Sequence, residues 1–225
     1  MVKLKRFDWT SLVPQPVIGV DEVGRGCLAG PVYAAAAIVP PEHIQALRKL
    51  GVTDSKLLTA EKRARLTIEI LRLCRVGVGF ATHDEIDEIN ILQASFLAMK
   101  RAILELQRDL QGAPFGLETA HILIDGNQRI PMRGAEFEGL STCSQTTLIK
   151  GDLRALPIAA ASIVAKVTRD QMMTEAAREF PVYGFEQHKG YAALNHRKAI
   201  EEHGPSRIHR KSFSGVREFL ARTNS

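Results

Sequence analysis

Short apolar runs closed by proline, glycine or acidic residues occur five times along the chain, and each predicts a buried β-strand. The predicted strands span residues 17–20, 32–39, 76–80, 121–124 and 146–149. The second run is mostly alanine, a poor strand former. Its prediction therefore depends on the prolines that close it and on small side chains that allow close packing.

Apolar residues between the strands recur at spacings of three and four, which predicts helices. The strongest pattern is one long stripe, formed by Ile89, Leu92, Phe96, Met99, Ile103, Leu106 and Leu110. We interpret this stripe as core and expect Gly112 and Pro114 to end the helix. Further predicted helices span 41–50, 60–73 and 157–180, with two short ones after residue 180. This order of elements predicts an α/β fold, a mixed β-sheet flanked by helices.

The composition is that of an ordinary globular protein of 225 residues, with 45% hydrophobic and 24% charged residues. A net charge of +5 and a pI of about 9.2 favour a polyanionic partner. Three widely spaced cysteines without a CxxC motif argue against a zinc site and a disulfide framework, and fit a reducing cytosol. There is neither a membrane-spanning apolar run nor the apolar region of a signal peptide, so we expect a cytoplasmic protein and no membrane partner.

Acidic residues stand at three of the predicted strand ends. Asp21 and Glu22 follow the first strand, Asp125 follows the fourth, and Asp152 comes soon after the fifth. Sites in mixed sheets gather where strands end and loops begin. A solvated strand end explains any single acid, but three such ends in one sheet favour a common site.

The glycine-rich segment after the first strand adds anion-binding groups to these acids. Asp21 and Glu22 face opposite ways in a regular strand, so they share a site only if the backbone turns between or just after them. Gly24 and Gly26 allow such a turn and expose backbone N–H groups beside Arg25. Carboxylates next to anion-binding donors suit a metal-bound phosphate, whereas the structural alternative is a simple hairpin.

Four converging carboxylates repel one another, and a hard divalent cation removes that cost. Ligands that are all oxygen select Mg²⁺ or Mn²⁺ over zinc. Two such ions, roughly 3.5–4 Å apart, can generate a hydroxide and stabilise the leaving oxygen of a phosphoryl displacement. The spaced acidic loop of a calcium-storage site is absent from the sequence.

The chain resembles a type 2 ribonuclease H, ribonuclease HII, in seven groups of motifs that occur in family order between about residues 16 and 215. These segments read GVDEVGRG with LAGPV (19–32), DSK (54–56), IDGN (124–127), KGD (150–152), AAASIVAKVTRD (159–170), HKGY (188–191), and HGPS with IHR (203–210). Any one of them is weak evidence, but seven in order are strong.

The resemblance implies a ribonuclease H-like fold, with a lead segment at 1–15, a catalytic core at 16–180, and a loop and helix extension at 181–225 that completes the substrate site. It implies endonucleolytic cleavage of RNA in RNA–DNA hybrids and at single ribonucleotides in duplex DNA, leaving 5′-phosphate and 3′-hydroxyl ends. It also implies two divalent cations, Mn²⁺ or Mg²⁺. The implied catalytic and metal-binding acids are Asp21, Glu22, Asp125 and Asp152. The implied substrate-binding residues are Gly24, Arg25, Gly26, Ser55, Lys56 and Tyr191.

Several basic residues are expected to contact phosphates without reading sequence. They are Lys56, Lys150, Lys189, Arg207, His209, Arg210 and Lys211. Asp170 is expected to pair with a basic neighbour instead of a metal. Three residues depart from the family pattern: Cys27 and Arg207 stand where proline is usual, and Leu57 replaces a common lysine. These departures put substrate affinity in doubt but leave the four acids intact.

Other functions remain open at this point. Ribonuclease HIII shares the fold but carries an additional N-terminal domain, for which the sixteen residues before the first strand are too few. A catalytically silent hybrid-binding module should have lost at least one acid. Another metal-dependent nuclease of the same superfamily, or a small-molecule phosphatase, would fit the acids alone. We expect a monomer, and the sequence leaves open the physiological metal and whether a sliding clamp is a partner.

Overall fold

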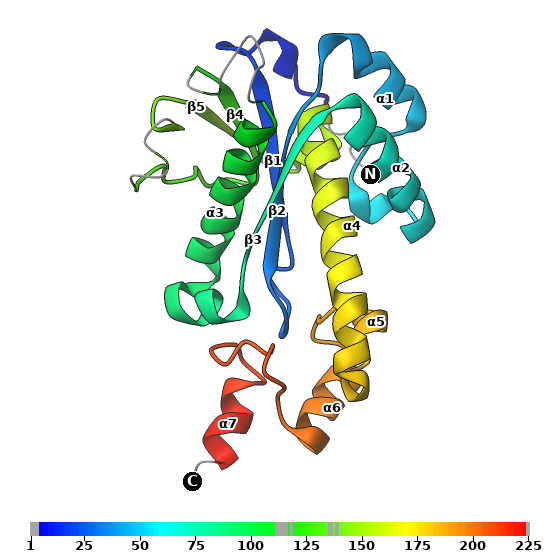
Figure 1. The fold of residues 1–225 in the computed structure, drawn as a ribbon, viewed down its shortest axis with the longest axis vertical. Helices are drawn as coiled ribbons and strands as arrows, with labels where there is room; N and C mark the ends of the chain where they lie inside the picture. The colour runs from blue at the N-terminus through cyan, green and yellow to red at the C-terminus, as the bar shows by residue number, and fades with distance from the viewer. Residues whose placement is uncertain (1–4, 111–116, 118, 135–136, 138–139, 224–225) are drawn as a thin grey trace.

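The central strand, β1, carries the first two acids and lies in the middle of a five-stranded sheet. A computed structural model describes residues 5–110, 117, 119–134, 137 and 140–223. The sheet has the order β3-β2-β1-β4-β5 (Figure 1). Its strands are β1 (Val17–Val23), β2 (Val32–Ile38), β3 (Arg75–Ala81), β4 (His121–Asp125) and β5 (Ser144–Leu148). β2 and β3 run antiparallel to their neighbours, whereas β4 and β5 are parallel to β1, so the mixed α/β sheet is confirmed.

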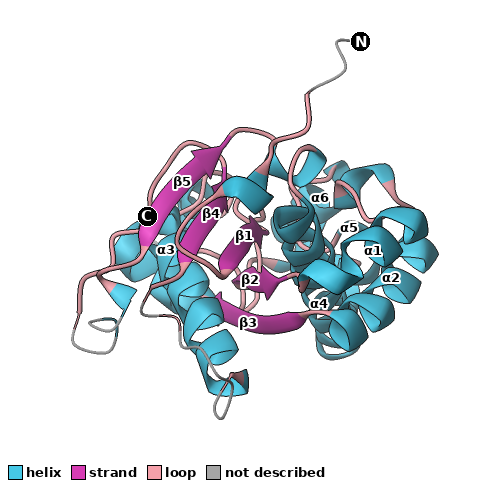
Figure 2. Ribbon diagram, turned by 90° about the horizontal axis from the view of Figure 1, so that it is seen from above, coloured by secondary structure: helices cyan, strands magenta, loops and turns pink. Residues whose placement is uncertain are grey.

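Helices cover both faces of the sheet (Figure 2). One face packs against α3, and the other packs against α4, with α2 on the outer side of α4. The helices are α1 (Ile44–Leu50), α2 (Ala60–Leu73), α3 (His83–Asp109), α4 (Leu156–Glu179), α5 (Phe185–His188), α6 (Leu194–His203) and α7 (Arg217–Thr223). None of the helices among the described residues combines the length and apolar character needed to cross a bilayer.

Small residues in the strands let the two long helices approach the sheet closely. A Cβ on Gly19 in β1 would lie 2.2 Å from the carbonyl carbon of Pro157, at the start of α4. A Cβ on Gly77 in β3 would lie 2.2 Å from the carbonyl oxygen of Ala102 in α3. The alanines of β2 are fully buried between these layers. The predicted alanine-rich strand is therefore confirmed, and its small side chains serve close helix packing.

The long predicted helix differs from its expectation in one respect. α3 begins at His83, where the Thr82 side chain and the Glu85 side chain form a capping box. Asn90, with φ 66° and ψ 163°, interrupts the helix, and its side chain accepts hydrogen bonds from the backbone N–H groups of Leu92 and Gln93. Asn90 therefore caps the second part of α3 as an N-cap residue does. The expected helix end at residues 112 and 114 lies outside the described residues.

The C-terminal part of the chain packs against the far end of α4 (Figure 1). It contains three α-helices instead of the two expected short ones, because a four-residue helix, α5, precedes α6 and α7. Its apolar residues share one buried cluster with Leu28, Ala29, Met173 and Ala177. The cluster therefore joins this part to the loop after β1 and to α4, whereas the domain boundaries proposed above stay a prediction.

Candidate active site

The register of the parallel strands places Asp21 beside Asp125. Val20 pairs with Ile124, so the next residue of each strand is an aspartate. The apolar run predicted that the first strand ends before Asp21. In the structure β1 continues to Val23, so Asp21 and Glu22 lie inside the strand. Asp21 faces α4, because the nearby Gly19 packs on α4 and the Asp21 carboxylate interacts with the Ser162 hydroxyl there. Glu22 faces the opposite way, as alternation requires.

Asp152 approaches the same point from the loop between β5 and α4. Lys150 adopts a left-handed conformation with φ 55°, and a short 3-10 helix, Gly151–Leu153, follows. The backbone N–H of Gly151 donates to Asp125 Oδ1 at 2.6 Å, which ties this loop to the end of β4. The Asp152 residue is 5% exposed. Three separate segments thus bring their acids to one end of the sheet.

The pKa shifts of these acids reflect burial and mutual repulsion. Burial raises the pKa of Asp21 well above its usual range, and the neighbouring charges of Glu22, Asp125 and Asp152 raise it further. Burial also raises the pKa of Glu22, against the opposing effect of Arg25. Burial, followed by Asp125 and Asp54, raises the pKa of Asp152 to about 6. The structure therefore brings the four predicted acids into one electrostatic environment.

The four carboxylates do not form a ready-made metal cage. Within the part of the chain that the structure describes, no three His, Cys, Asp or Glu side chains are placed so that they could hold an ion as they stand. Each carboxylate instead accepts a local hydrogen bond: Asp21 from Glu22 N (2.8 Å), Glu22 from Arg25 Nη1 (3.3 Å), Asp125 from Gly151 N (2.6 Å), and Asp152 from Leu153 N (2.9 Å).

An all-oxygen donor set with buried, partly uncompensated negative charge nevertheless fits a hard divalent cation. Side-chain rotation would have to turn the carboxylates from their local partners toward an ion. The metal-binding role of these acids stays a prediction.

The Gly-Arg-Gly segment forms a turn directly after β1. Gly24 has φ +95°, and its carbonyl oxygen accepts a hydrogen bond from Cys27 N at 3.4 Å. Arg25 is exposed and forms an ion pair with Glu22 at 3.3 Å. Gly26 is also exposed, and a Cβ at this position would meet no atom within 4 Å. The turn therefore presents an open surface next to the acids.

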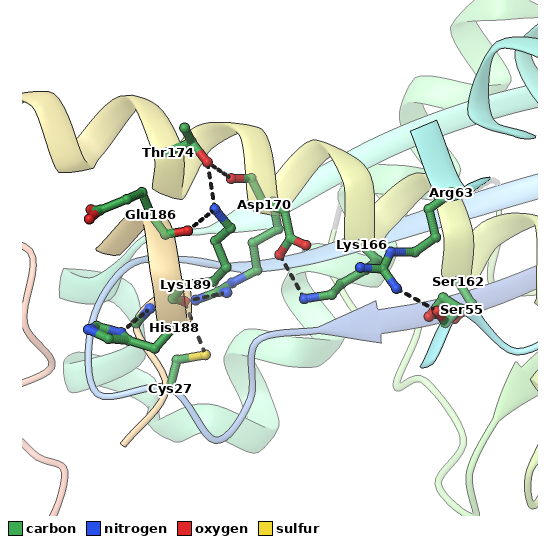
Figure 3. A network of polar contacts seen from close by, with 12 residues as sticks. Cys27, Ser55, Arg63, Ser162, Lys166, Asp170, Thr174, Glu186, His188 and Lys189 are labelled. Carbon is green, nitrogen blue, oxygen red and sulfur yellow. Dashed lines mark hydrogen bonds and ion pairs between the residues drawn. The ribbon is translucent and has the colours of Figure 1, made fainter. Parts of the chain in front are cut away.

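Ser55 and Lys56 lie in a 3-10 helix (Ser55–Leu57) that packs on α4, and Figure 3 shows Ser55 beside Ser162 of that helix. Ser55 is 4% exposed, and its hydroxyl lies 3.0 Å from the hydroxyl of Ser162. Lys56 is exposed, and its backbone N–H donates to Asp54 Oδ1 at 2.8 Å. Arg63 donates to the carbonyl oxygens of Ser55 and Leu58, which holds this segment against α2. Direct substrate contact by Ser55 and Lys56 stays a prediction.

Tyr191 lies opposite the Gly-Arg-Gly turn, and the residue is 40% exposed. An isolated β-bridge joins Tyr191 to Cys27, and the Cys27 side chain also contacts the tyrosine hydroxyl. The Lys166 Nζ and the Arg169 guanidinium lie 5.8 and 5.9 Å from the ring centroid. Cations on an aromatic face stabilise its position. The ring is thus held beside the turn while part of it remains accessible.

Two fully buried histidines hold the backbone of Tyr191. The carbonyl oxygen of Tyr191 accepts a hydrogen bond from His196 Nδ1 at 2.8 Å, so the proton of His196 is on Nδ1. His196 Nε2 therefore accepts from His209 Nε2 at 3.0 Å, and His209 Nδ1 accepts from Ser206 N at 2.9 Å. This arrangement requires both rings to be neutral. Burial lowers the pKa of His196 to about 4 and that of His209 to about 3.

Two expected phosphate contacts, those of His209 and Arg210, are wrong, whereas those of Lys189 and Arg207 stay predictions. His209 and Arg210 are fully buried and cannot meet a nucleic acid. Lys189 Nζ donates to Thr174 Oγ1 and to the Glu186 carbonyl oxygen, both at 2.7 Å (Figure 3). Arg207 pairs with Glu179. Lys56, Lys150 and Lys211 are exposed, as a phosphate contact requires.

The pairing of Asp170 is confirmed. Its carboxylate accepts from Lys166 Nζ at 2.7 Å, four residues earlier on α4 (Figure 3). This spacing is the usual one for a helical ion pair.

Sequence reasoning missed three kinds of supporting residue. Asp54 raises the pKa of Asp152 and caps the 3-10 helix, and its signal was its place beside Ser55 and Lys56. Ser162 contacts both Asp21 and Ser55, and it was visible only as a polar residue inside an apolar helix. Arg169 and Arg210 both stand in the family motifs, but nothing in the sequence indicated that they are buried, because charged residues are expected at the surface.

The chain is similar to known proteins over most of its length. A family model described as Ribonuclease HII matches residues 18–216. The ribonuclease HII of Rhizobium meliloti (strain 1021) is 48% identical over 205 residues, which cover 90% of this chain and 84% of that protein. The crystal structure of ribonuclease H2 from Pyrococcus horikoshii OT3 has a TM-score of 0.71 at 26% identity, covering 93% of this chain and 99% of that one. The PCNA:RNase HII complex from Archaeoglobus fulgidus gives 0.67 at 28% identity, covering 90% and 97%.

Proposed function

The chain belongs to the ribonuclease HII family and is a metal-dependent ribonuclease. We propose that it cuts the RNA strand of RNA–DNA hybrids, and that it also cuts duplex DNA at single embedded ribonucleotides. The products would carry 5′-phosphate and 3′-hydroxyl ends. The observation that carries this proposal is the placement of buried Asp21 beside Asp125, with Glu22 and Asp152 close enough to perturb its pKa.

We further propose that Asp21, Glu22, Asp125 and Asp152 hold two divalent cations, Mg²⁺ or Mn²⁺. Bound ions of this kind supply a water-derived nucleophile and stabilise the leaving oxygen of an in-line displacement. The chain contributes the oxygen ligands and keeps them at one end of the sheet. Burial and repulsion raise the pKa values of Asp21 and Asp152, so a cation would relieve an unfavourable charge cluster there.

Substrate binding is proposed for the surface around the Gly-Arg-Gly turn. A ribose 2′-hydroxyl can both donate and accept a hydrogen bond, which distinguishes RNA from DNA at one position. The exposed turn offers backbone groups for this purpose, and the half-exposed ring of Tyr191 lies opposite, where it can pack on a sugar. Lys56 is exposed near Asp152 and suits contact with a phosphate.

A sliding clamp is a further proposed partner. The similar Archaeoglobus protein was solved in complex with PCNA, which supports a clamp as a partner here. A role in removing ribonucleotides during DNA replication and repair, in the cytoplasm and as a monomer, completes the proposal.

The direct test is incubation of the protein with a duplex that contains one ribonucleotide, in Mg²⁺ or Mn²⁺, followed by sizing of the products. We expect one cut at the ribonucleotide. Asp125→Asn should abolish cleavage while binding of the duplex persists. Asp170→Asn is the matched control, because this acid pairs with Lys166 on α4 and should leave most of the activity. A duplex that stays intact both in Mg²⁺ and in Mn²⁺ would refute the proposed nuclease activity, and would favour a catalytically silent hybrid-binding module.

A further inference from the structure

Arg210 is a fully buried cation whose hydrogen-bonding partners belong to the loop after β1. Its Nη2 donates to the carbonyl oxygen of Gly24 at 2.7 Å, and its Nη1 donates to that of Arg25 at 2.8 Å. Its Nε donates to the carbonyl oxygen of Gly30 at 2.9 Å. Among the described residues, no carboxylate forms an ion pair with Arg210, so its charge is stabilised by backbone carbonyl groups and by the Phe213 ring, whose centroid lies 4.9 Å from the guanidinium carbon.

These bonds determine which way two peptide groups point. A trans peptide group is planar and holds its C=O and N–H on opposite sides. The peptide bonds that follow Gly24 and Arg25 are trans. Since Arg210 binds both carbonyl oxygens on the inner side of the turn, the N–H groups of Arg25 and Gly26 must point outward. Neither N–H has a hydrogen-bond partner in the part of the chain that the structure describes, and both residues are exposed.

The second buried arginine shows that this effect is specific to Arg210. Arg169 is equally buried and donates to the carbonyl oxygens of Ala29, Pro31 and Lys189. Of the N–H groups that follow these carbonyls, the one of Gly30 donates to Ile208 O and the one of Gly190 to His188 Nδ1. Arg169 therefore fastens the loop to its surroundings, whereas Arg210 also orients donors that remain free.

We propose that Arg210 is a positioning residue for substrate recognition, which presets the peptide groups of the Gly-Arg-Gly turn so that the N–H groups of Arg25 and Gly26 converge on an oxygen of the ribonucleotide. This inference rests on the proposed function and adds a residue that never touches the substrate. The fixed orientation matters because donors that are already oriented bind an oxygen without first being ordered. The guanidinium behind the turn also polarises both peptide groups, which makes their N–H groups stronger donors.

The test compares the affinity of the protein for a duplex with one ribonucleotide and for the same duplex made of DNA alone. The preference is the ratio of the two dissociation constants. Both are measured with Ca²⁺ in place of Mg²⁺, so that the duplex is not cleaved. Arg210→Lys keeps the charge but loses the fork that bridges two carbonyl oxygens. We expect the preference to fall about tenfold, as the loss of about 1.4 kcal/mol of hydrogen bonding predicts. Affinity for the all-DNA duplex should change less than twofold.

Ile103→Ala is the control for stability alone, because Ile103 is fully buried against the sheet in the separate core under α3. It should lower the free energy of unfolding, because it leaves a cavity in the core, and leave the preference unchanged. If Arg210→Lys does not fold, the wild-type protein provides the second measurement. Its Arg25 and Gly26 amide proton resonances should move downfield with the ribonucleotide duplex and not with the all-DNA duplex.

The outcomes separate this inference from the proposed function. A wild-type protein that neither prefers nor cleaves the ribonucleotide duplex overturns both. A wild-type preference that Arg210→Lys retains overturns the role of Arg210 only. Amide resonances of Arg25 and Gly26 that respond equally to the two duplexes overturn it as well.

Discussion

The two glycines of the Gly-Arg-Gly turn should respond in opposite ways to the same substitution. An alanine Cβ at Gly24 would lie 2.2 Å from Arg169 Nε and 2.8 Å from its Cζ, at a backbone φ of +95°. An alanine Cβ at Gly26 would meet no atom within 4 Å, and its φ is not in the left-handed region. Gly24 is therefore required by the fold, whereas the fold has no need of glycine at position 26.

The magnitudes follow from these contacts. At Gly24, a positive φ costs an L-residue about 1–2 kcal/mol. Displacing Arg169 weakens at least one of its three bonds to carbonyl oxygens, each worth about 1.5–3 kcal/mol. Gly24→Ala should therefore destabilise the protein by about 3–5 kcal/mol. Gly26→Ala should change the free energy of unfolding by less than about 1 kcal/mol.

Gly26→Ala, which should hardly change stability, should slow cleavage of the substrate. The added methyl group occupies the open space over the turn, where we propose that the ribonucleotide lies. Loss of one hydrogen bond to the ribose 2′-hydroxyl, at about 0.5–1.5 kcal/mol, predicts a roughly 2- to 12-fold slower cleavage. The assay combines urea unfolding with single-turnover cleavage of a duplex that carries one ribonucleotide.

Gly51→Ala provides the control for backbone strain. Gly51 has φ +83° at the end of α1, and its Cβ would meet only the flexible end of Lys62 at 3.3 Å. It should cost about 1–2 kcal/mol and leave cleavage unchanged. Normal cleavage by a stable Gly26→Ala protein would refute the close approach of the substrate. A Gly24→Ala protein no less stable than Gly51→Ala would refute the clash with Arg169.

Two further predictions concern the extension. Tyr191→Ala should slow cleavage at an isolated ribonucleotide more than cleavage of a long hybrid, since only one sugar can meet the ring there; equal losses on both substrates would contradict the assignment. Burial lowers the pKa of His196 from 6.5 to about 4 and the pKa of His209 from 6.5 to about 3. Between these values and pH 6.5, the unfolded chain binds the two protons and the folded protein does not, so stability falls as the pH falls. Each ring should therefore cost about 2 kcal/mol of stability at pH 5 relative to pH 7.5. His209→Gln should remove about half of this difference in urea titrations, whereas an unchanged difference would contradict the neutral pair.

The sheet was predictable because its strands depend on local patterning. All five predicted strands are present with shifts of a few residues at their ends, and the close-packing role of the alanines in β2 was correctly anticipated. The break at Asn90 was not predictable from the apolar stripe, because the stripe continues across a residue whose side chain caps a new helical segment. Local sequence alone does not distinguish an asparagine inside a helix from one that starts it.

The buried polar network was not predictable for a different reason. His209 and Arg210 were assigned to the surface because isolated charges are rarely buried. Their burial depends on carbonyl oxygens and a histidine that come from other parts of the chain, so no local pattern announces it. The acids, in contrast, stand in or beside predicted strands, so a common site was predictable from local patterns, whereas the register that places Asp21 beside Asp125 was not.

The contact between Arg210 and Gly24 joins residues 186 positions apart. The turn after β1 is synthesised early during translation, whereas the guanidinium that orients it is added 186 residues later. A growing chain therefore has its acids and its first strands long before the recognition loop is rigid. We expect ribosome-bound chains that end before residue 210 to show a weaker preference for ribonucleotides than chains that include it, so that substrate selection develops only after residue 210 has been added.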